Sequence, residues 1–322
     1  MLNRIRVHSP SRLHFGLLGW GDHAPRQFGG VGLMIEEPGL EILVEPTSRW
    51  EAIGPSAART LEVAMDVAKR LGVEGFPVGP IRLENLALPE AHVGLGVGTQ
   101  LSLAVARALT ELAGLHHTPV TTLARLTNRG RRSGIGIHGF AEGGFIVDAG
   151  RRGDDDLPTK LIRLPFPGAW SILIVLPEQS QGLHGVEELN AFGRLPPMLD
   201  RMSDRLCRLV LLGLLPALYE TDLYAFGAAL SEIQQIVGRT FSPVQGGHFS
   251  HPEIELVGES MTRLGLQGVG QSSWGPTLYG FSDGDEKERE KYRQRLIHEF
   301  KFDPRKVYWT RASNVGAITT PT

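Results

Sequence analysis

The sequence of 322 residues contains one cysteine, Cys207. A lone cysteine cannot close an intramolecular disulfide, and it cannot supply the several thiolates of a zinc or iron–sulfur site. The first residues, MLNRIRVHSP, lack the apolar core of a secretory signal peptide. We therefore expect a cytoplasmic protein that has neither a disulfide framework nor a multi-cysteine metal centre.

Long hydrophobic runs and an excess of positive charge are also missing. The longest apolar stretch, LVLLGLLPAL at 209–218, is about half of a bilayer span and contains Pro216. Lysine and arginine total 33 against 35 aspartates and glutamates, so the formal net charge is −2. The sequence therefore predicts neither a membrane partner nor a nucleic-acid partner. A phosphate-bearing small molecule remains compatible with it, because a local site needs no basic surface.

The distribution of patterns along the chain predicts an α+β fold. At about 150 residues per domain, the length suggests two domains, and we place them at residues 1–165 and 166–322. Helical spacing is found in 57–72, 101–112, 121–129 and 285–300, and several helices are expected within 185–265. Strand patterns are found in 5–15, 41–46, 81–85, 145–147, 160–164, 171–176 and 268–281, with a closing strand at 306–310.

A glycine-rich loop, GLGVGTQ at 94–100, directly precedes a helical pattern. Glycines allow a backbone to approach a ligand closely, and the first amides of a helix have no intrahelical partners. The positive end of the helix dipole favours phosphate or diphosphate there. The spacing matches neither the Walker A loop nor GxGxxG. The alternative is a glycine turn that packs tightly against a sheet.

The segment SRLHFGLL at 11–18 places Arg12 and His14 on one face of a strand, with Leu13 and Phe15 on the other. The polar face is a candidate wall of a site, and the alternative is a solvent-exposed strand face.

Two further glycine-rich segments carry polar side chains. In RGRRSGIGIHGFAEGG, which starts at Arg129, the histidine and the glutamate could move a proton or hold a polar group of a ligand; the alternative is a mobile basic loop. In GQSSWGPT at 270–277, the serines could bind an oxyanion and Trp274 could stack on an aromatic ring. The alternative there is a tight hairpin with a core tryptophan.

The order of these segments resembles that of the GHMP kinase superfamily, and the resemblance spans nearly the whole chain. PSRLHFG lies near the start, GLGVGTQLSLAVA near residue 100 and GVGQSSWGPTLYGF near residue 270. Within the superfamily, SRLHFGLL, GLGVGTQ, RSGIGIHGFAEGGFIVDAGR and GQSSWGPT look most like the β-ribofuranosylaminobenzene 5′-phosphate synthases. The resemblance implies an N-terminal domain like ribosomal protein S5 and a C-terminal ferredoxin-like domain.

The chain departs from the kinase pattern at two places. The kinase motif GLGSSAA has serines where this chain has Val97 and Gly98. Kinases with a catalytic base have an aspartate after SGI, where this chain has Gly136. Both departures suit release of diphosphate better than transfer of a γ-phosphoryl group.

The family reaction joins phosphoribosyl diphosphate to 4-aminobenzoate and releases diphosphate and CO2, on the route to tetrahydromethanopterin. It implies Mg²⁺ with the diphosphate and no pyridoxal phosphate, and a homodimer. An ATP-dependent small-molecule kinase is the alternative, and a non-catalytic protein that binds a phosphorylated ligand is a third interpretation.

The resemblance also suggests roles for individual residues. Catalytic or proton-handling roles go to Arg12, His14, His138 and Glu142. Binding of phosphate or diphosphate goes to Gly94, Gly96, Gly98, Thr99, Gln100 and Ser133. Contacts to the other parts of the substrates go to Ser11, Arg131, Arg132, Gly270, Gln271, Ser272, Ser273 and Trp274. No residue is assigned as a metal ligand.

Overall fold

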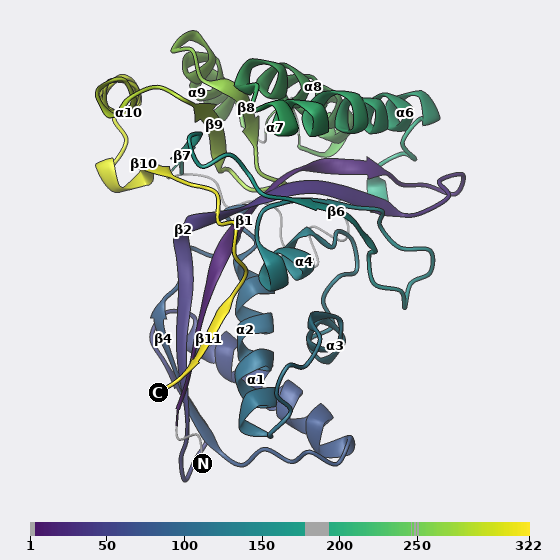
Figure 1. The fold of residues 1–322 in the computed structure, drawn as a ribbon, viewed down its shortest axis with the longest axis vertical. Helices are drawn as coiled ribbons and strands as arrows, with labels where there is room; N and C mark the ends of the chain where they lie inside the picture. The colour runs from purple at the N-terminus through teal and green to yellow at the C-terminus, as the bar shows by residue number, and fades with distance from the viewer. Residues whose placement is uncertain (1–3, 178–192, 246, 248, 250) are drawn as a thin grey trace.

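The computed structural model describes residues 4–177, 193–245, 247, 249 and 251–322. It contains two β-sheets with helices packed against them (Figure 1). The first sheet has seven strands, β1 (Ile5–Gly19), β2 (Phe28–Pro46), β3 (Glu51–Ile53), β4 (Ile81–Ala87), β5 (Phe145–Asp148), β6 (Lys160–Leu164) and β11 (Ile318–Pro321). The second has four, β7 (Ser171–Val175), β8 (Gln267–Gln271), β9 (Leu278–Ser282) and β10 (Val307–Thr310).

The helices separate into two groups along the chain. The first group is α1 (Ala57–Val73), α2 (Val97–Leu112), α3 (Val120–Leu126) and α4 (Ile135–Glu142). The second is α6 (Asp200–Leu209), the π-helical η1 (Val210–Leu214), α7 (Leu215–Glu220), α8 (Leu223–Gln245), α9 (Pro252–Arg263), α10 (Glu286–Phe300) and the 3-10 turn η2 (Pro304–Lys306). None of these described helices combines the length and the apolar character needed to cross a membrane.

The first sheet has the order β11-β1-β2-β4-β3, with β5 paired to β2 and β6 to β5. Strands β1 and β2 form a long antiparallel hairpin that reaches from the lower part of the molecule to the underside of α8 (Figure 1). Close to the turn of the hairpin, residues 30–33 of β2 pair with β5, and at the other end residues 41–46 pair with β4. This hairpin therefore carries side chains from the first sheet to the second group of helices.

The hydrophobic core continues across the two halves of the chain. Phe15 on β1 lies 5.2 Å from Tyr279 and 6.2 Å from Phe281, both on β9, measured between ring centroids. All three side chains are fully buried. A second cluster joins α1 and α2 to the inner face of the first sheet. Because burial of aromatic side chains dominates core energetics, Phe15 fixes β1 firmly against the second sheet.

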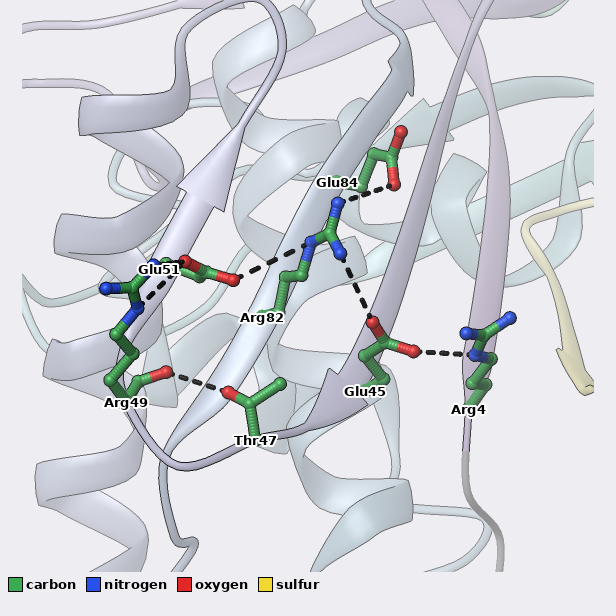
Figure 2. Close-up of polar contacts among 7 residues, drawn as sticks. All are labelled: Arg4, Glu45, Thr47, Arg49, Glu51, Arg82 and Glu84. Atoms are coloured by element: carbon green, nitrogen blue, oxygen red, sulfur yellow. Dashed lines mark hydrogen bonds and ion pairs between the residues drawn. The ribbon is translucent and has the colours of Figure 1, made fainter.

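The outer face of the first sheet carries a ladder of ion pairs (Figure 2). The guanidinium of Arg82 lies 3.7 Å from Glu45, 3.8 Å from Glu51 and 3.7 Å from Glu84, and Arg4 lies 2.6 Å from Glu45. Exposed pairs of this kind each contribute at most about 1 kcal/mol. The ladder indicates that this face is solvated, with the helices on the other face.

Three local expectations need correction. Strand β2 begins at Phe28, well before the predicted 41–46, because Gly29, Gly30 and Gly32 hide its alternating pattern. The glycine-rich segment that starts at Arg129, for which a mobile basic loop was the alternative, contains helix α4. The strand at 306–310 does not close the fold, since β11 follows it and pairs with β1.

The proposed division at 165 and 166 stays a prediction. Strands β1 to β6 build the first sheet and β7 to β10 the second, but β11 returns to the first sheet from the end of the chain. Within the expected helical region 185–265, residues 185–192, 246, 248 and 250 lie outside the described residues.

Candidate functional site

A cavity of about 300 Å³ lies where β1, the start of α2, residues 128–133, α8 and residues 271–274 meet. This volume is at the lower end of the usual range for small-molecule pockets. Its lining combines arginines, which we call the cationic wall, with apolar and aromatic residues, which we call the apolar wall. Nine of the predicted site residues line it, namely Arg12, His14, Thr99, Arg131, Arg132, Ser133, Gln271, Ser273 and Trp274.

The cationic wall contains Arg12, Arg129, Arg131 and Arg132. Arg129 donates to Ser102 Oγ at 2.9 Å, and Arg131 donates to Asn128 Oδ1 at 3.0 Å. None of the described residues that line the cavity is an aspartate or a glutamate. Four guanidinium groups without a lining carboxylate favour a ligand that carries several negative charges.

The start of α2 adds backbone donors beside this wall. Gly96 is the N-cap residue, and its carbonyl accepts from the Thr99 and Gln100 amides at 3.0 and 3.1 Å. The helix axis therefore starts at Gly96, next to Arg12, because a Cβ at Gly96 would lie 2.9 Å from Arg12 Nε. The positive end of a 16-residue helix and a guanidinium thus face the same region.

The apolar wall is built mainly by α8 and the loop after β8. Its members include Phe15, Leu17, Val237, Phe241, Phe249 and Trp274. The ring centroids of Phe241 and Trp274 are 4.5 Å apart, and Trp20 stacks on Phe241 at 5.6 Å with an interplanar angle of 6°. Aromatic side chains of this kind can pack against an aromatic ring.

His14 lines the cavity in its neutral form. Burial lowers the pKa of His14 well below its ordinary value, and the nearby guanidinium groups of Arg12 and Arg132 lower it further. Its backbone amide donates to Ser272 Oγ at 3.0 Å, and its carbonyl accepts from the Ser273 amide at 3.2 Å. Near neutral pH, His14 can therefore donate one hydrogen bond and accept one.

Ser272 lies in a junction between the two halves of the chain, where its side chain is fully buried. Its hydroxyl donates to the Gly94 carbonyl at 2.7 Å while it accepts from the His14 amide. The backbones meet so closely that a Cβ at Gly94, where φ is +94°, would lie 2.3 Å from the Ser272 carbonyl oxygen. Ser272 and Gly94 therefore hold the cavity together, although both were predicted to contact ligand.

The Ser272→Ala variant is expected to lose about 2 kcal/mol of unfolding free energy, because two buried backbone groups lose their partner. Urea unfolding of both proteins measures this loss. If Ser272 bound substrate instead, its replacement would raise KM and leave the unfolding midpoint unchanged. That result would contradict the junction role.

Several other predicted residues are also placed away from the cavity lining. Gln100 is buried, accepts from Ser9 Oγ at 2.8 Å and donates to the Gly136 carbonyl at 2.8 Å. Ser11 is 2% exposed in β1. Gly270 lies against the Gln234 side chain, with a Cβ position 2.6 Å from it. Gly98 is exposed at the start of α2.

His138 and Glu142 lie on α4 and do not line the cavity. His138 Nε2 is 2.9 Å from the Pro158 carbonyl, and burial lowers the pKa of the imidazole. Glu142 is paired with Lys160. Their catalytic roles stay untested predictions, and we assign them no part in the proposal below.

Gly136 occupies the place of the kinase aspartate at a tight helix contact. A Cβ here would lie 3.2 Å from Thr99 Cγ2 and 3.4 Å from Gln100 Nε2. A side chain at this position would therefore require Thr99 or Gln100 to shift by a few tenths of an ångström. This contact explains in physical terms why a glycine suits this position.

Asp148 is a buried carboxylate beside the cavity that the sequence analysis did not identify. It ends β5, and it accepts from Ser133 Oγ at 3.0 Å, from the Gly134 amide at 2.9 Å and from the Gly150 amide at 2.8 Å. Burial raises the pKa of Asp148 to about 6, against the opposing effect of these bonds and of Arg26. A lone acid at the end of the buried run FIVD was the available sequence signal.

The raised pKa of Asp148 predicts a specific pH effect on stability. Between the unfolded value of 3.8 and about 6, the folded protein holds an extra proton at this site. The contribution of Asp148 to stability therefore increases as the pH falls through 6. From pH 7 to pH 5, the wild type should gain about 1 kcal/mol relative to Asp148→Asn. Urea unfolding at both pH values measures it, and a constant difference would contradict the assignment.

No family model matches the sequence, but individual relatives do. The chain is 35% identical over 305 residues to the β-ribofuranosylphenol 5′-phosphate synthase of Methanothermobacter thermautotrophicus, covering 88% of this chain and 90% of the relative. It is 32% identical to the enzyme of the same name from Archaeoglobus fulgidus, covering 97% and 98%.

Solved structures show the same fold at low sequence identity. Homoserine kinase from Cytophaga hutchinsonii is 19% identical with a TM-score of 0.66, covering 99% of this chain and 98% of the other. Mevalonate diphosphate decarboxylase from Staphylococcus aureus is 14% identical with a TM-score of 0.66 and the same coverage. The two-domain α+β fold predicted from the GHMP motifs is thereby confirmed. The chain belongs to the β-ribofuranosylphenol 5′-phosphate synthase family, which has the GHMP kinase fold.

Proposed function

We propose that this chain transfers the ribosyl 5′-phosphate group of phosphoribosyl diphosphate to a 4-substituted benzoate, releasing diphosphate and CO2. The observation that carries the proposal is the composition of the cavity lining, which combines four arginines with a set of aromatic side chains. A polyanionic sugar phosphate suits the first wall and a benzoate ring suits the second. Sequence analysis predicted 4-aminobenzoate, whereas the name of the relatives points to a ring hydroxyl and hence to 4-hydroxybenzoate.

The chemistry requires electron donation from the para substituent. That group pushes electron density to the ring carbon that bears the carboxylate, and this carbon attacks C1 of the ribosyl group as the bond to diphosphate breaks. The C–C bond to the carboxylate then breaks, CO2 leaves, and the bonding electrons restore the aromatic ring. For a hydroxybenzoate, the hydroxyl proton leaves on attack and returns to the oxygen after CO2 is lost. Because the electrons of the broken C–C bond stay in the ring, no external electron acceptor is needed.

The residues of the cavity match these requirements. In the proposed reaction Arg12 and the start of α2 bind the departing diphosphate, because guanidinium and backbone donors stabilise developing negative charge. Arg131 and Arg132 are placed to bind the 5′-phosphate or the benzoate carboxylate. Trp274 and Phe241 hold the ring and exclude water from the ribosyl centre.

Mg²⁺ is proposed to accompany the diphosphate. The described lining residues provide neutral oxygen donors, such as Thr99, Asn128 and Ser133, but no carboxylate. Such a donor set fits an ion that keeps most of its ligands from diphosphate oxygens and water. When bound, the ion would neutralise charge on the leaving diphosphate. In the proposal, the arginines bind the negatively charged oxygens of the diphosphate. A homodimer also stays a proposal, which comes from the family resemblance.

The kinase alternative has less support in this chain. By the family resemblance, the position of the kinase base is Gly136, which has no proton acceptor in its side chain. The family membership likewise supports the synthase over a kinase.

Incubation with phosphoribosyl diphosphate, Mg²⁺ and carboxyl-labelled 4-hydroxybenzoate or 4-aminobenzoate tests the proposal. We expect release of labelled CO2 together with an equal amount of diphosphate. Diphosphate release without labelled CO2 would contradict the decarboxylating reaction. The ratio of rates with the two acids determines which substituent is preferred.

A further inference from the structure

Ser133 is a cavity-lining hydroxyl whose proton is already engaged. Its Oγ lies 3.0 Å from Asp148 Oδ2. That oxygen also accepts from the Gly134 amide, and the other carboxylate oxygen accepts from the Gly150 amide. Asp148 is fully buried, so these donors hold it in one orientation.

The hydrogen-bond inventory decides what Ser133 can offer to a ligand. An ionised carboxylate only accepts, so the single hydroxyl proton of Ser133 points to Asp148. The Ser133 oxygen also accepts from the Ile135 amide at 3.2 Å. One acceptor position of the hydroxyl remains for the cavity. Phosphate and carboxylate oxygens are acceptors as well, so they gain no hydrogen bond there.

His14 completes the local geometry. A Cβ at Gly30 would lie 2.5 Å from Ser133 Oγ, 2.9 Å from Asp148 Oδ2 and 3.3 Å from His14 Nε2. The three polar groups therefore surround one point on β2, where Gly30 leaves room for them. His14 adds no positive charge here, because its imidazole is neutral. Ser133 and His14 thus give this corner no positive charge of their own, although Arg12 and Arg132 lie near His14.

We infer that Asp148 holds Ser133 as a hydrogen-bond acceptor, and that Ser133 binds a hydroxyl group of the substrate rather than a phosphate. The inference rests on the proposed function and refines the expectation that Ser133 binds phosphate. Two sources could supply the hydroxyl, the ribose of phosphoribosyl diphosphate and the ring substituent of 4-hydroxybenzoate. Both present an O–H donor to the same acceptor.

The test compares the Ser133→Ala variant with the wild type by calorimetric titration at pH 8, where Asp148 is ionised. The probes are phosphoribosyl diphosphate, inorganic diphosphate, and 4-hydroxybenzoate added to protein saturated with diphosphate. We expect one hydroxyl-bearing probe to bind about tenfold more weakly, as for loss of one hydrogen bond. Inorganic diphosphate, which has neither a ribose hydroxyl nor a ring hydroxyl, should bind with unchanged affinity.

The pattern of losses identifies the source. Loss for phosphoribosyl diphosphate alone assigns a ribose hydroxyl. Loss for 4-hydroxybenzoate, with 4-fluorobenzoate unaffected, assigns the ring hydroxyl. Unchanged affinity for both hydroxyl-bearing probes would overturn the inference, and so would an equal loss for inorganic diphosphate.

Two further variants make the result specific. Ser260→Ala is the matched control, because Ser260 also donates to a carboxylate, Glu299 Oε2 at 3.1 Å, but does not line the cavity. It should leave all affinities unchanged. Asp148→Asn can direct an amide donor at Ser133 and free the serine proton, so it should weaken the hydroxyl-bearing probe as Ser133→Ala does. Wild-type protein that binds neither substrate would overturn the proposed function, whereas wild-type binding with an insensitive Ser133→Ala overturns only this inference.

Discussion

Replacement of Arg12 by alanine is expected to lower kcat/KM about 10³-fold while the unfolding midpoint changes little. Loss of two charge-assisted hydrogen bonds to an anion corresponds to about 4 kcal/mol, which is about three powers of ten in rate. Arg12 contributes to the cavity wall next to Gly96, whereas its neighbours Leu13 and Phe15 form the core. The variant should therefore remain folded and still lose turnover. Steady-state kinetics and thermal unfolding together measure both effects.

Two variants control this experiment. Arg12→Lys keeps the charge but loses the planar fork, so an intermediate loss of activity is expected. Arg205→Ala removes an exposed arginine that pairs with Glu232 at 2.6 Å outside the cavity, and it should be fully active. An Arg12→Ala protein with kcat/KM within about fivefold of the wild type, a change below 1 kcal/mol, would remove Arg12 from the site.

Replacement of Gly98 by valine should weaken phosphoribosyl diphosphate binding by about 100-fold or more, equivalent to about 3 kcal/mol. Gly98 is exposed at the second position of α2, and a Cβ there meets only Arg129 Nη2, at the ordinary contact distance of 3.8 Å. The protein can therefore accommodate the side chain, but a diphosphate against the helix start cannot. Equilibrium titration with phosphoribosyl diphosphate measures the loss.

Gly72→Ala is the matched control for the substitution at residue 98. Gly72 also lies in a helix, α1, and no atom lies within 4 Å of the position of its Cβ. Both substitutions should leave the protein folded, and Gly72→Ala should raise stability by about 0.5–1 kcal/mol. Unchanged affinity of Gly98→Val for phosphoribosyl diphosphate would exclude the start of α2 from the anion site.

The parts of the fold that sequence predicted correctly depend on local periodicity. The apolar spacing of α2 and the alternation of Arg12 and His14 with Leu13 and Phe15 are local patterns, and the structure places these faces as expected. Helix α4 escaped prediction because its glycines suppress helix propensity. Strand β11 escaped because a short Thr- and Pro-containing tail gains its pairing only from β1.

The site could be predicted only in part, because several contacts join residues that are distant in sequence. The Ser272 hydroxyl donates a hydrogen bond to the carbonyl of Gly94, which lies 178 positions away in the sequence. The structural role of Ser272 therefore has no local signature. Gln234 and Phe241 reach the cavity from α8, whose apolar pattern is that of an ordinary core helix. Asp148 acquires its role through Ser133 only when β5 and α4 come together. The sequence predicted the arginines and Trp274 of the cavity lining, whereas the contribution of α8 became apparent only in the tertiary structure.

The central claim is that the cavity accepts a phosphoribosyl donor and not a nucleoside triphosphate. Calorimetric titration of the wild type with Mg²⁺ and phosphoribosyl diphosphate, before and after addition of a non-hydrolysable ATP analogue, tests it most directly. The account predicts that phosphoribosyl diphosphate binds at one site per chain and that the analogue leaves its affinity unchanged. Tight binding of the analogue that displaces phosphoribosyl diphosphate, and that weakens in Gly98→Val, would contradict the account.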